Sequence, residues 1–120
     1  MDSRPYRDAQ ILIIDDEPAN FAVLVRLLNA QGFLNIRTTT DPRQVLALIL
    51  ETPPDLIMLD LHMPQTTGFE VQAQLVKRGR STPVIVITGD DSPEAQSRAL
   101  RLGAKGYFGK PVDDEASAKK

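Results

Sequence analysis

Short apolar runs alternate along the chain with longer segments in which apolar residues recur at helical spacing. This pattern predicts five strands: Ile11–Ile14, Asn35–Thr39, Leu56–Leu59, Val84–Thr88 and Gly106–Lys110. Three of them are nearly unbroken aliphatic runs, which is typical of strands that are covered on both faces of a sheet. The second run is half polar and therefore predicts an edge strand.

The four segments between these strands have the periodicity of amphipathic helices. Gly32 and Gly79 stand where the first and third helices would end, which is a common place for glycine. Asp41–Pro42 and Ser92–Pro93 each combine a capping residue with a proline suited to the first helical position. The resulting order βαβαβαβαβ predicts an α/β fold, in which helices cover both faces of a parallel sheet.

The length, charge and composition of the chain exclude several classes of protein. A chain of 120 residues is long enough for one domain with a hydrophobic core and too short for two. The net charge of −2 gives no electrostatic footprint for nucleic acid, and the lack of cysteine excludes disulfides and zinc–cysteine sites. Because the chain has neither a signal peptide nor an apolar run long enough for a membrane, we expect a cytoplasmic protein.

Acidic residues stand at the carboxyl ends of two apolar strands. Asp15 and Asp16 follow the first strand, and Asp60 follows the third. Ligands bind at the carboxyl ends of strands in a parallel α/β sheet, and carboxylates gathered there repel one another unless a cation such as Mg²⁺ lies among them. Taken alone, Asp15 and Asp16 are explained equally well as turn and capping residues. No predicted helix begins directly after Asp60, so capping does not explain it.

Two further polar residues end the fourth and fifth strands. Thr88 in a strand and Lys110 at the end of an element are each unremarkable when taken alone. Together with the acids they make one coherent chemistry. Asp60 is an oxygen nucleophile able to form an acyl phosphate, and Asp16 with Asp60 holds the Mg²⁺ that neutralises the transferring group. Thr88 and Lys110 receive the equatorial oxygens of that group.

Four stretches of the chain resemble the receiver domain of response regulators in two-component signalling: ILIIDDEP, DLIMLDLHMP, VIVITG and GAKGYFGKP. The resemblance covers about residues 9–112, so we expect residues 1–120 to form a single receiver domain. It implies a flavodoxin-like, doubly wound, five-stranded parallel sheet with the strand order 2-1-3-4-5. This order places strands 1 and 3 side by side and brings Asp15, Asp16 and Asp60 together.

The resemblance also implies a reaction and its metal. In the family, the residue at the position of Asp60 accepts a phosphoryl group from the phosphohistidine of a sensor histidine kinase or a phosphotransfer protein. The implied Mg²⁺ ligands are Asp16, Asp60 and the backbone carbonyl of His62, while Asp15 acts through water. His62 by itself predicts only a loop residue, because one histidine without cysteines is poor evidence for zinc.

Other residues take roles by the same resemblance. Thr88 and Lys110 would contact the phosphoryl group. Tyr107 matches the switch aromatic of the family, although the sequence alone favours an ordinary half-exposed strand residue. The side chains of His62 and Asp90 match positions that tune dephosphorylation.

The chain departs from the family after its fifth strand. A receiver continues there into a fifth amphipathic helix, whereas only residues 112–120 remain here, and they are few and polar. We therefore expect helix 5 to be truncated or missing and the chain to be the N-terminal part of a longer protein. We also expect two copies to associate through the face that helix 5 would cover.

Two other functions remain open. An aspartyl-phosphate hydrolase on the same fold usually has a second aspartate two residues after its nucleophile, where this chain has His62. A nucleotide- or flavin-binding module would have a glycine-rich phosphate loop, and none is present. A receiver, by contrast, is a signalling switch rather than an enzyme, and it catalyses only the phosphorylation and dephosphorylation of its own Asp60.

Overall fold

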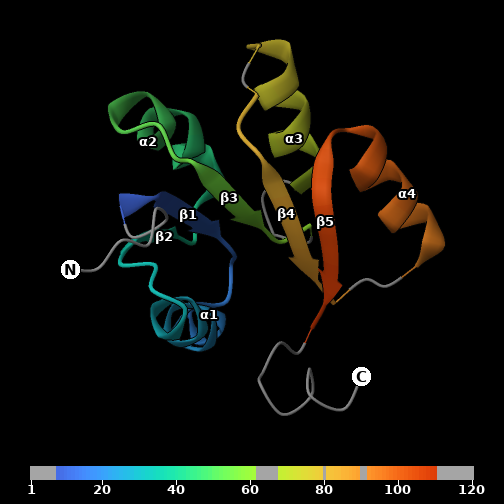
Figure 1. The fold of residues 1–120 in the computed structure, drawn as a ribbon. Helices are drawn as coiled ribbons and strands as arrows, with labels where there is room; N and C mark the ends of the chain where they lie inside the picture. The colour runs from blue at the N-terminus through green and yellow to red at the C-terminus, as the bar shows by residue number, and fades with distance from the viewer. Residues whose placement is uncertain (1–7, 62–67, 80, 90–91, 111–120) are drawn as a thin grey trace.

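The computed structural model describes residues 8–61, 68–79, 81–89 and 92–110. Within them, five parallel strands form one sheet in the order β2-β1-β3-β4-β5, which is the flavodoxin-like arrangement (Figure 1). The strands are β1 (Gln10–Ile14), β2 (Asn35–Thr39), β3 (Leu56–Leu59), β4 (Val84–Thr88) and β5 (Ala104–Gly109). The predicted strand order is confirmed, and the half-polar strand β2 does lie at an edge.

In the described part of the chain, four α-helices occupy the predicted segments: α1 (Pro18–Ala30), α2 (Val45–Glu51), α3 (Gly68–Lys77) and α4 (Pro93–Arg101). One turn of 3-10 helix, η2 (Pro42–Gln44), precedes α2. The predicted caps are present, since the Asp41 carboxylate accepts the Arg43 N–H at 2.9 Å and the Ser92 hydroxyl oxygen accepts the Ala95 N–H at 3.2 Å. None of the described helices is long and apolar enough to span a bilayer.

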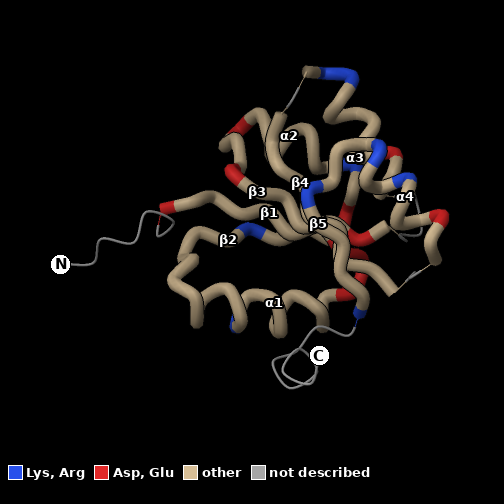
Figure 2. Tube along the Cα trace, turned by 45° about the vertical axis from the view of Figure 1, so that its right-hand side comes forward, with Lys and Arg blue, Asp and Glu red and all other residues tan. Residues whose placement is uncertain are grey.

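The sheet separates two hydrophobic clusters. Successive side chains of a strand point to opposite faces, so Ile11 and Ile13 of β1 pack towards α1 while Leu12 and Ile14 pack towards the other helices. Both views show α1 on one side of the sheet and α2, α3 and α4 on the other (Figures 1 and 2). Strand β1 is thus covered on both faces, as its unbroken aliphatic sequence predicts.

Strand β5 differs from its predicted bounds of Gly106–Lys110. It begins two residues earlier because Ala104 pairs with Val84, while Gly106 pairs with Ile85, so the pairing register shifts by one residue at this point. Such a shift inserts an extra residue into one strand, and a hydrophobic pattern does not reveal it. Lys110 lies just beyond the strand.

The face of the sheet that carries α1 is incompletely covered by the described residues. Phe108 of β5 is 54% exposed, and its ring lies against Gly106 on the side of the sheet where Ile85 also projects. Ile85 and Met58 are only partly buried, whereas the β1 side chains on this face are fully buried beneath α1. The bare part of this face therefore lies towards β5.

Candidate active site

The polar residues that follow the strands are positioned by the sheet itself. The N–H of Asp15 donates to the carbonyl of the last residue of β2 at 3.2 Å, and the N–H of Asp60 donates to the carbonyl of Ile14 at 3.0 Å. On the other side, the N–H of Lys110 donates to the carbonyl of Thr88 at 2.9 Å. The backbone hydrogen bonds thus continue one residue past β1, β3 and β5 and fix where the side chains of Asp15, Asp60 and Lys110 begin.

Three carboxylates and one ammonium meet at this edge of the sheet. Oxygens of Asp15, Asp16 and Asp60 all lie within 4.8 Å of one another. The Lys110 ammonium lies 2.8 Å from Asp15 Oδ2 and 3.2 Å from Asp60 Oδ2. Figure 2 shows acidic segments gathered behind the C-terminal end of β5. The predicted grouping of these aspartates is therefore observed.

Solvent reaches the three carboxylates unequally. Asp15 is 2% exposed and Asp60 is 5% exposed, whereas Asp16 is exposed. Asp16 is therefore the carboxylate that a cation from solvent would meet first.

The charges at this edge perturb one another. Loss of solvent around its carboxyl group, and then the charges of Asp15 and Asp60, raise the pKa of Asp16 even though the residue as a whole is exposed. Burial acts to lower the pKa of Lys110, but its hydrogen bond to Asp15 and the charges of Asp60 and Asp15 outweigh burial and raise that pKa. The cluster therefore keeps Lys110 charged and has an excess of negative charge.

This excess fits a divalent cation. Three carboxylates and one ammonium leave a net charge of about −2, and every side-chain ligand that the cluster offers is oxygen. Oxygen ligands with one or two direct carboxylates are what Mg²⁺ prefers in proteins, where it keeps several waters. The residues present therefore fit Mg²⁺.

Two of the remaining predicted residues, Thr88 and Tyr107, lie within the described structure. Thr88 is fully buried at the end of β4. Tyr107 of β5 is partly buried and packs against the hydrophobic cluster beneath α2, α3 and α4. His62, with its predicted carbonyl ligand, and Asp90 lie outside the described residues. Their predicted roles stay predictions.

Two residues near the cluster were not found by sequence reasoning. Asn20 in the first turn of α1 donates its side-chain amide to Asp15 Oδ2 at 3.1 Å. Gly68 at the start of α3 donates its N–H to the carbonyl of Leu61 at 2.8 Å, and a Cβ on it would collide with the carbonyl oxygen of Asp60. In the sequence, the features that could have indicated these two residues are an amide side chain five residues after Asp15 and a glycine at the start of a predicted helix.

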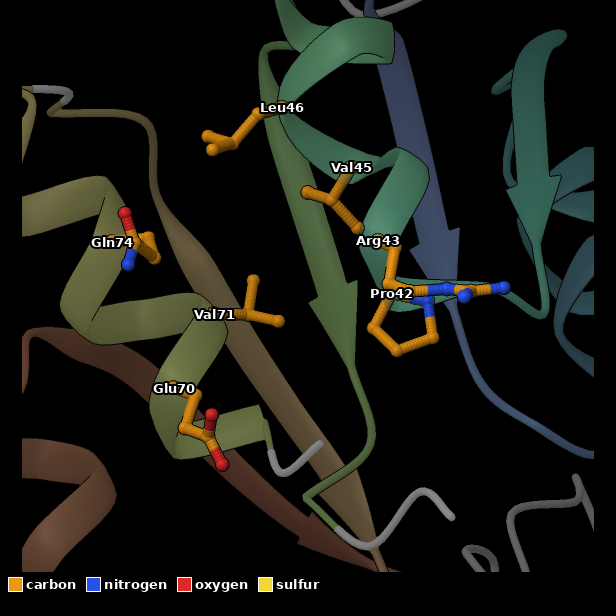
Figure 3. A pocket seen from close by; sticks show the side chains of 7 residues that line it. All are labelled: Pro42, Arg43, Val45, Leu46, Glu70, Val71 and Gln74. Atoms are coloured by element: carbon orange, nitrogen blue, oxygen red, sulfur yellow. The ribbon is translucent and has the colours of Figure 1, made fainter. Parts of the chain in front are cut away.

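A hollow of about 240 Å³ opens elsewhere, between α2 and α3. Figure 3 shows its apolar walls, with Val45 and Leu46 on one side facing Val71 on the other. Glu70 lies below Val71 on α3, and the Arg43 side chain extends away from Val71 (Figure 3). None of the clustered aspartates lines this hollow. The carboxylate cluster, and not this hollow, is therefore the candidate active site.

Comparison with known proteins gives a consistent result. Residues 11–120 match the family model of the response regulator receiver domain. The chain is 34% identical over 113 residues to Protein PilH of Pseudomonas aeruginosa, covering 92% of the chain and 93% of that protein. It is 36% identical over 102 residues to the response regulator MprA of Mycolicibacterium vanbaalenii, covering 85% of the chain but only 44% of MprA. The chain therefore spans nearly all of one relative and less than half of the other.

Solved structures resemble the chain over the same extent. The chemotaxis protein CheY4 of Vibrio cholerae superposes with a TM-score of 0.79 at 30% identity, covering 92% of this chain and 93% of that one. A CheY-like receiver domain protein of Methanospirillum hungatei gives a TM-score of 0.79 at 26% identity, covering 92% and 88%. The similarity therefore extends over most of the chain.

Proposed function

Because the chain belongs to the response regulator receiver family of two-component signalling, we propose that it is a phosphorylatable switch whose phosphoacceptor is Asp60. The donor is the phosphohistidine of a sensor histidine kinase or a phosphotransfer protein in the cytoplasm. The observation that carries this proposal is the Lys110 ammonium, which bridges Asp15 and Asp60 at 2.8 and 3.2 Å beside the exposed Asp16.

The positions of these groups support the following transfer. An oxygen of the Asp60 carboxylate attacks the phosphorus atom, an O–P bond forms, and the N–P bond of the phosphohistidine breaks with its electron pair returning to the imidazole. Lys110 is already 3.2 Å from Asp60, so a small movement brings its charge to an oxygen of the transferring group. When bound by Asp16, Asp60 and the carbonyl of His62, Mg²⁺ would neutralise part of the negative charge of that group.

Other residues have supporting roles in this proposal. Asp15 acts on the cation through water, since its own oxygens already accept bonds from protein groups. Thr88 contacts the phosphoryl group and Tyr107 responds to that contact. His62 and Asp90 tune the rate of dephosphorylation.

Labelling by a small phosphodonor tests the proposal. With Mg²⁺, the intact protein should gain the mass of one phosphoryl group, and Asp60→Asn should gain none. Asp16→Asn should bind Mg²⁺ more weakly and be labelled more slowly, and a chelator should abolish labelling. Asp55→Asn is the matched control, because Asp55 is an aspartate directly before the same strand that Asp60 follows.

Three results would contradict the proposal. Undiminished labelling of Asp60→Asn would refute the phosphoacceptor, and equal labelling in chelator would refute the cation. Turnover of an external phosphomonoester, without a stable mark on the protein, would instead support an aspartyl-phosphate hydrolase.

A further inference from the structure

Among the described residues, three donors hold the carboxylate of Asp15. The N–H of Glu17 donates to Oδ1 at 3.0 Å, while Oδ2 accepts both the Asn20 amide at 3.1 Å and the Lys110 ammonium at 2.8 Å. Asp15 is only 2% exposed, so water has little room to replace a donor that is lost. The orientation of this carboxylate therefore depends on these three groups.

Asn20 and Lys110 differ in what else they contact. Lys110 also lies 3.2 Å from Asp60, and under the proposed function its ammonium turns towards the phosphoryl group there. Within the described part of the chain, the one side-chain hydrogen bond of Asn20 is the bond to Asp15. When Lys110 moves, Asn20 is thus the donor that remains on Oδ2. The Glu17 N–H alone would hold one oxygen and leave the other free to swing.

The neutrality of the amide matters as well. The cluster has a net charge of about −2 that a divalent cation balances. A lysine at position 20 would hold Asp15 but reduce that negative charge, and an aspartate would remove the donor and add a repelling carboxylate. An amide supplies a donor and leaves the charge unchanged.

From this geometry we propose that Asn20 is a positioning residue, which keeps Asp15 in place while Lys110 contacts the phosphoryl group on Asp60. The proposal rests on the proposed function, because it concerns the state in which Lys110 has left Asp15. It assigns Asn20 no contact with the phosphoryl group or the cation.

Phosphorylation kinetics of Asn20→Ala test this role. The rate at saturating Mg²⁺ should fall about tenfold, the loss expected for one hydrogen bond to a charged group in the reacting state. The Mg²⁺ concentration for half-maximal rate should change by less than about twofold, because Lys110 still holds Asp15 before the reaction. Asn29→Ala, the same change at an exposed position of α1, should leave both quantities unchanged.

Two more variants separate positioning from folding. Asn20→Gln keeps the amide and should recover a large part of the rate, whereas Asn20→Asp should be slower than Asn20→Ala. A wild-type rate in Asn20→Ala, or an equal loss in Asn29→Ala, would overturn the role of Asn20 alone. A loss in Asn20→Ala that Asn20→Gln does not recover would also overturn it, since helix packing would then explain the effect. Absence of any label on the unaltered protein would refute the proposed function itself.

Discussion

At the scale of single residues, the acid cluster depends on a glycine as well as on its carboxylates. Gly68 begins α3 so close to the chain after β3 that an added Cβ would lie 2.9 Å from Leu61 Cα and would collide with the Asp60 carbonyl oxygen. Both neighbours are backbone atoms, which cannot rotate away as a side chain can. The position of Asp60 is therefore coupled to the absence of a side chain at position 68.

Gly68→Ala should therefore impair the phosphoacceptor more than its small size suggests. We expect a loss of about 1–3 kcal/mol in the free energy of unfolding, as for overpacked interiors, and a lower labelling rate of Asp60. Gly109→Ala is the control, because a Cβ there would meet nothing within 4 Å. Denaturant unfolding and phosphodonor labelling measure the two effects, and equal behaviour of the two variants would contradict this coupling.

Thr88 is the second residue with a specific expectation. Its side chain is fully buried at the end of β4, and Tyr107 pairs with Val86 on the same strand pair. Thr88→Ala should still accept a phosphoryl group on Asp60, but the NMR shifts of Tyr107 should respond less to phosphorylation, since the hydroxyl that follows the new oxygen is gone. Thr88→Ser keeps the hydroxyl and should respond like the unaltered protein. Identical Tyr107 shifts in the free and phosphorylated protein would disprove the coupling.

At the scale of elements, β2 does more than close the edge of the sheet. The guanidinium of its Arg37 donates to two carbonyls at the end of α2. One is that of Leu48 at 3.2 Å, which also accepts the N–H of Thr52, and the other is that of Thr52, the residue that follows the helix. A cation at this end also complements the helix dipole. The polar sequence of the strand thus supplies the C-terminal contact of the short helix that follows it.

Removing this contact should loosen α2. Arg37→Ala should lower the free energy of unfolding by about 1–3 kcal/mol, as expected when hydrogen bonds from a charged group are lost. The buried Nε of Arg37 has no hydrogen-bond partner in the described structure, which costs free energy in the folded protein. Removing the side chain also removes this cost, so part of the loss is offset. Arg43→Ala removes an exposed arginine that pairs with Asp41 at 3.0 Å, and it should change stability little. Thermal unfolding compares the two, and equal losses would show that Arg37 is not special.

At the scale of the whole molecule, the two faces of the sheet are covered unequally. Three helices cover one face, while α1 is the one described helix on the other and Phe108 remains exposed there. Burial of apolar surface contributes about 25 cal/mol per Å². Covering roughly a few hundred Å² of this face would therefore stabilise the protein by about several kcal/mol. Association of two copies through this face is the corresponding expectation.

Sedimentation at high concentration should therefore show a dimer or a larger species. Phe108→Glu should shift the equilibrium towards monomer, because a charge would be buried in the contact. Leu50→Glu places the same charge on an exposed leucine of α2, 66% exposed, and should leave association unchanged. A monomer at all concentrations, or an equal effect of both variants, would refute association through this face.

Much of this architecture could be predicted from local features of the sequence. Aliphatic runs gave the strands, and Gly32, Gly79 and Gly103 end three helices with φ of 100°, 70° and 104°, values that side-chain-bearing residues rarely adopt. The carboxylates at the strand ends could also be predicted from local sequence, because the residue that follows a strand is its neighbour in the chain. The strand order came from the resemblance to receivers, because hydrophobic periodicity does not specify which strands pair.

Only the tertiary structure decided how the site is assembled. Lys110 and Asp60 are 50 residues apart, and their 3.2 Å contact exists because β5 and β3 flank the same strand β4. The bond from Asn20 to Asp15 and the close approach of Gly68 to Asp60 depend on how α1 and α3 are docked on the sheet. Periodicity reports which face of an element is buried, whereas register and docking set which side chains meet. The sequence by itself therefore determined the elements and the carboxylates, and the packing of distant elements determined their partners.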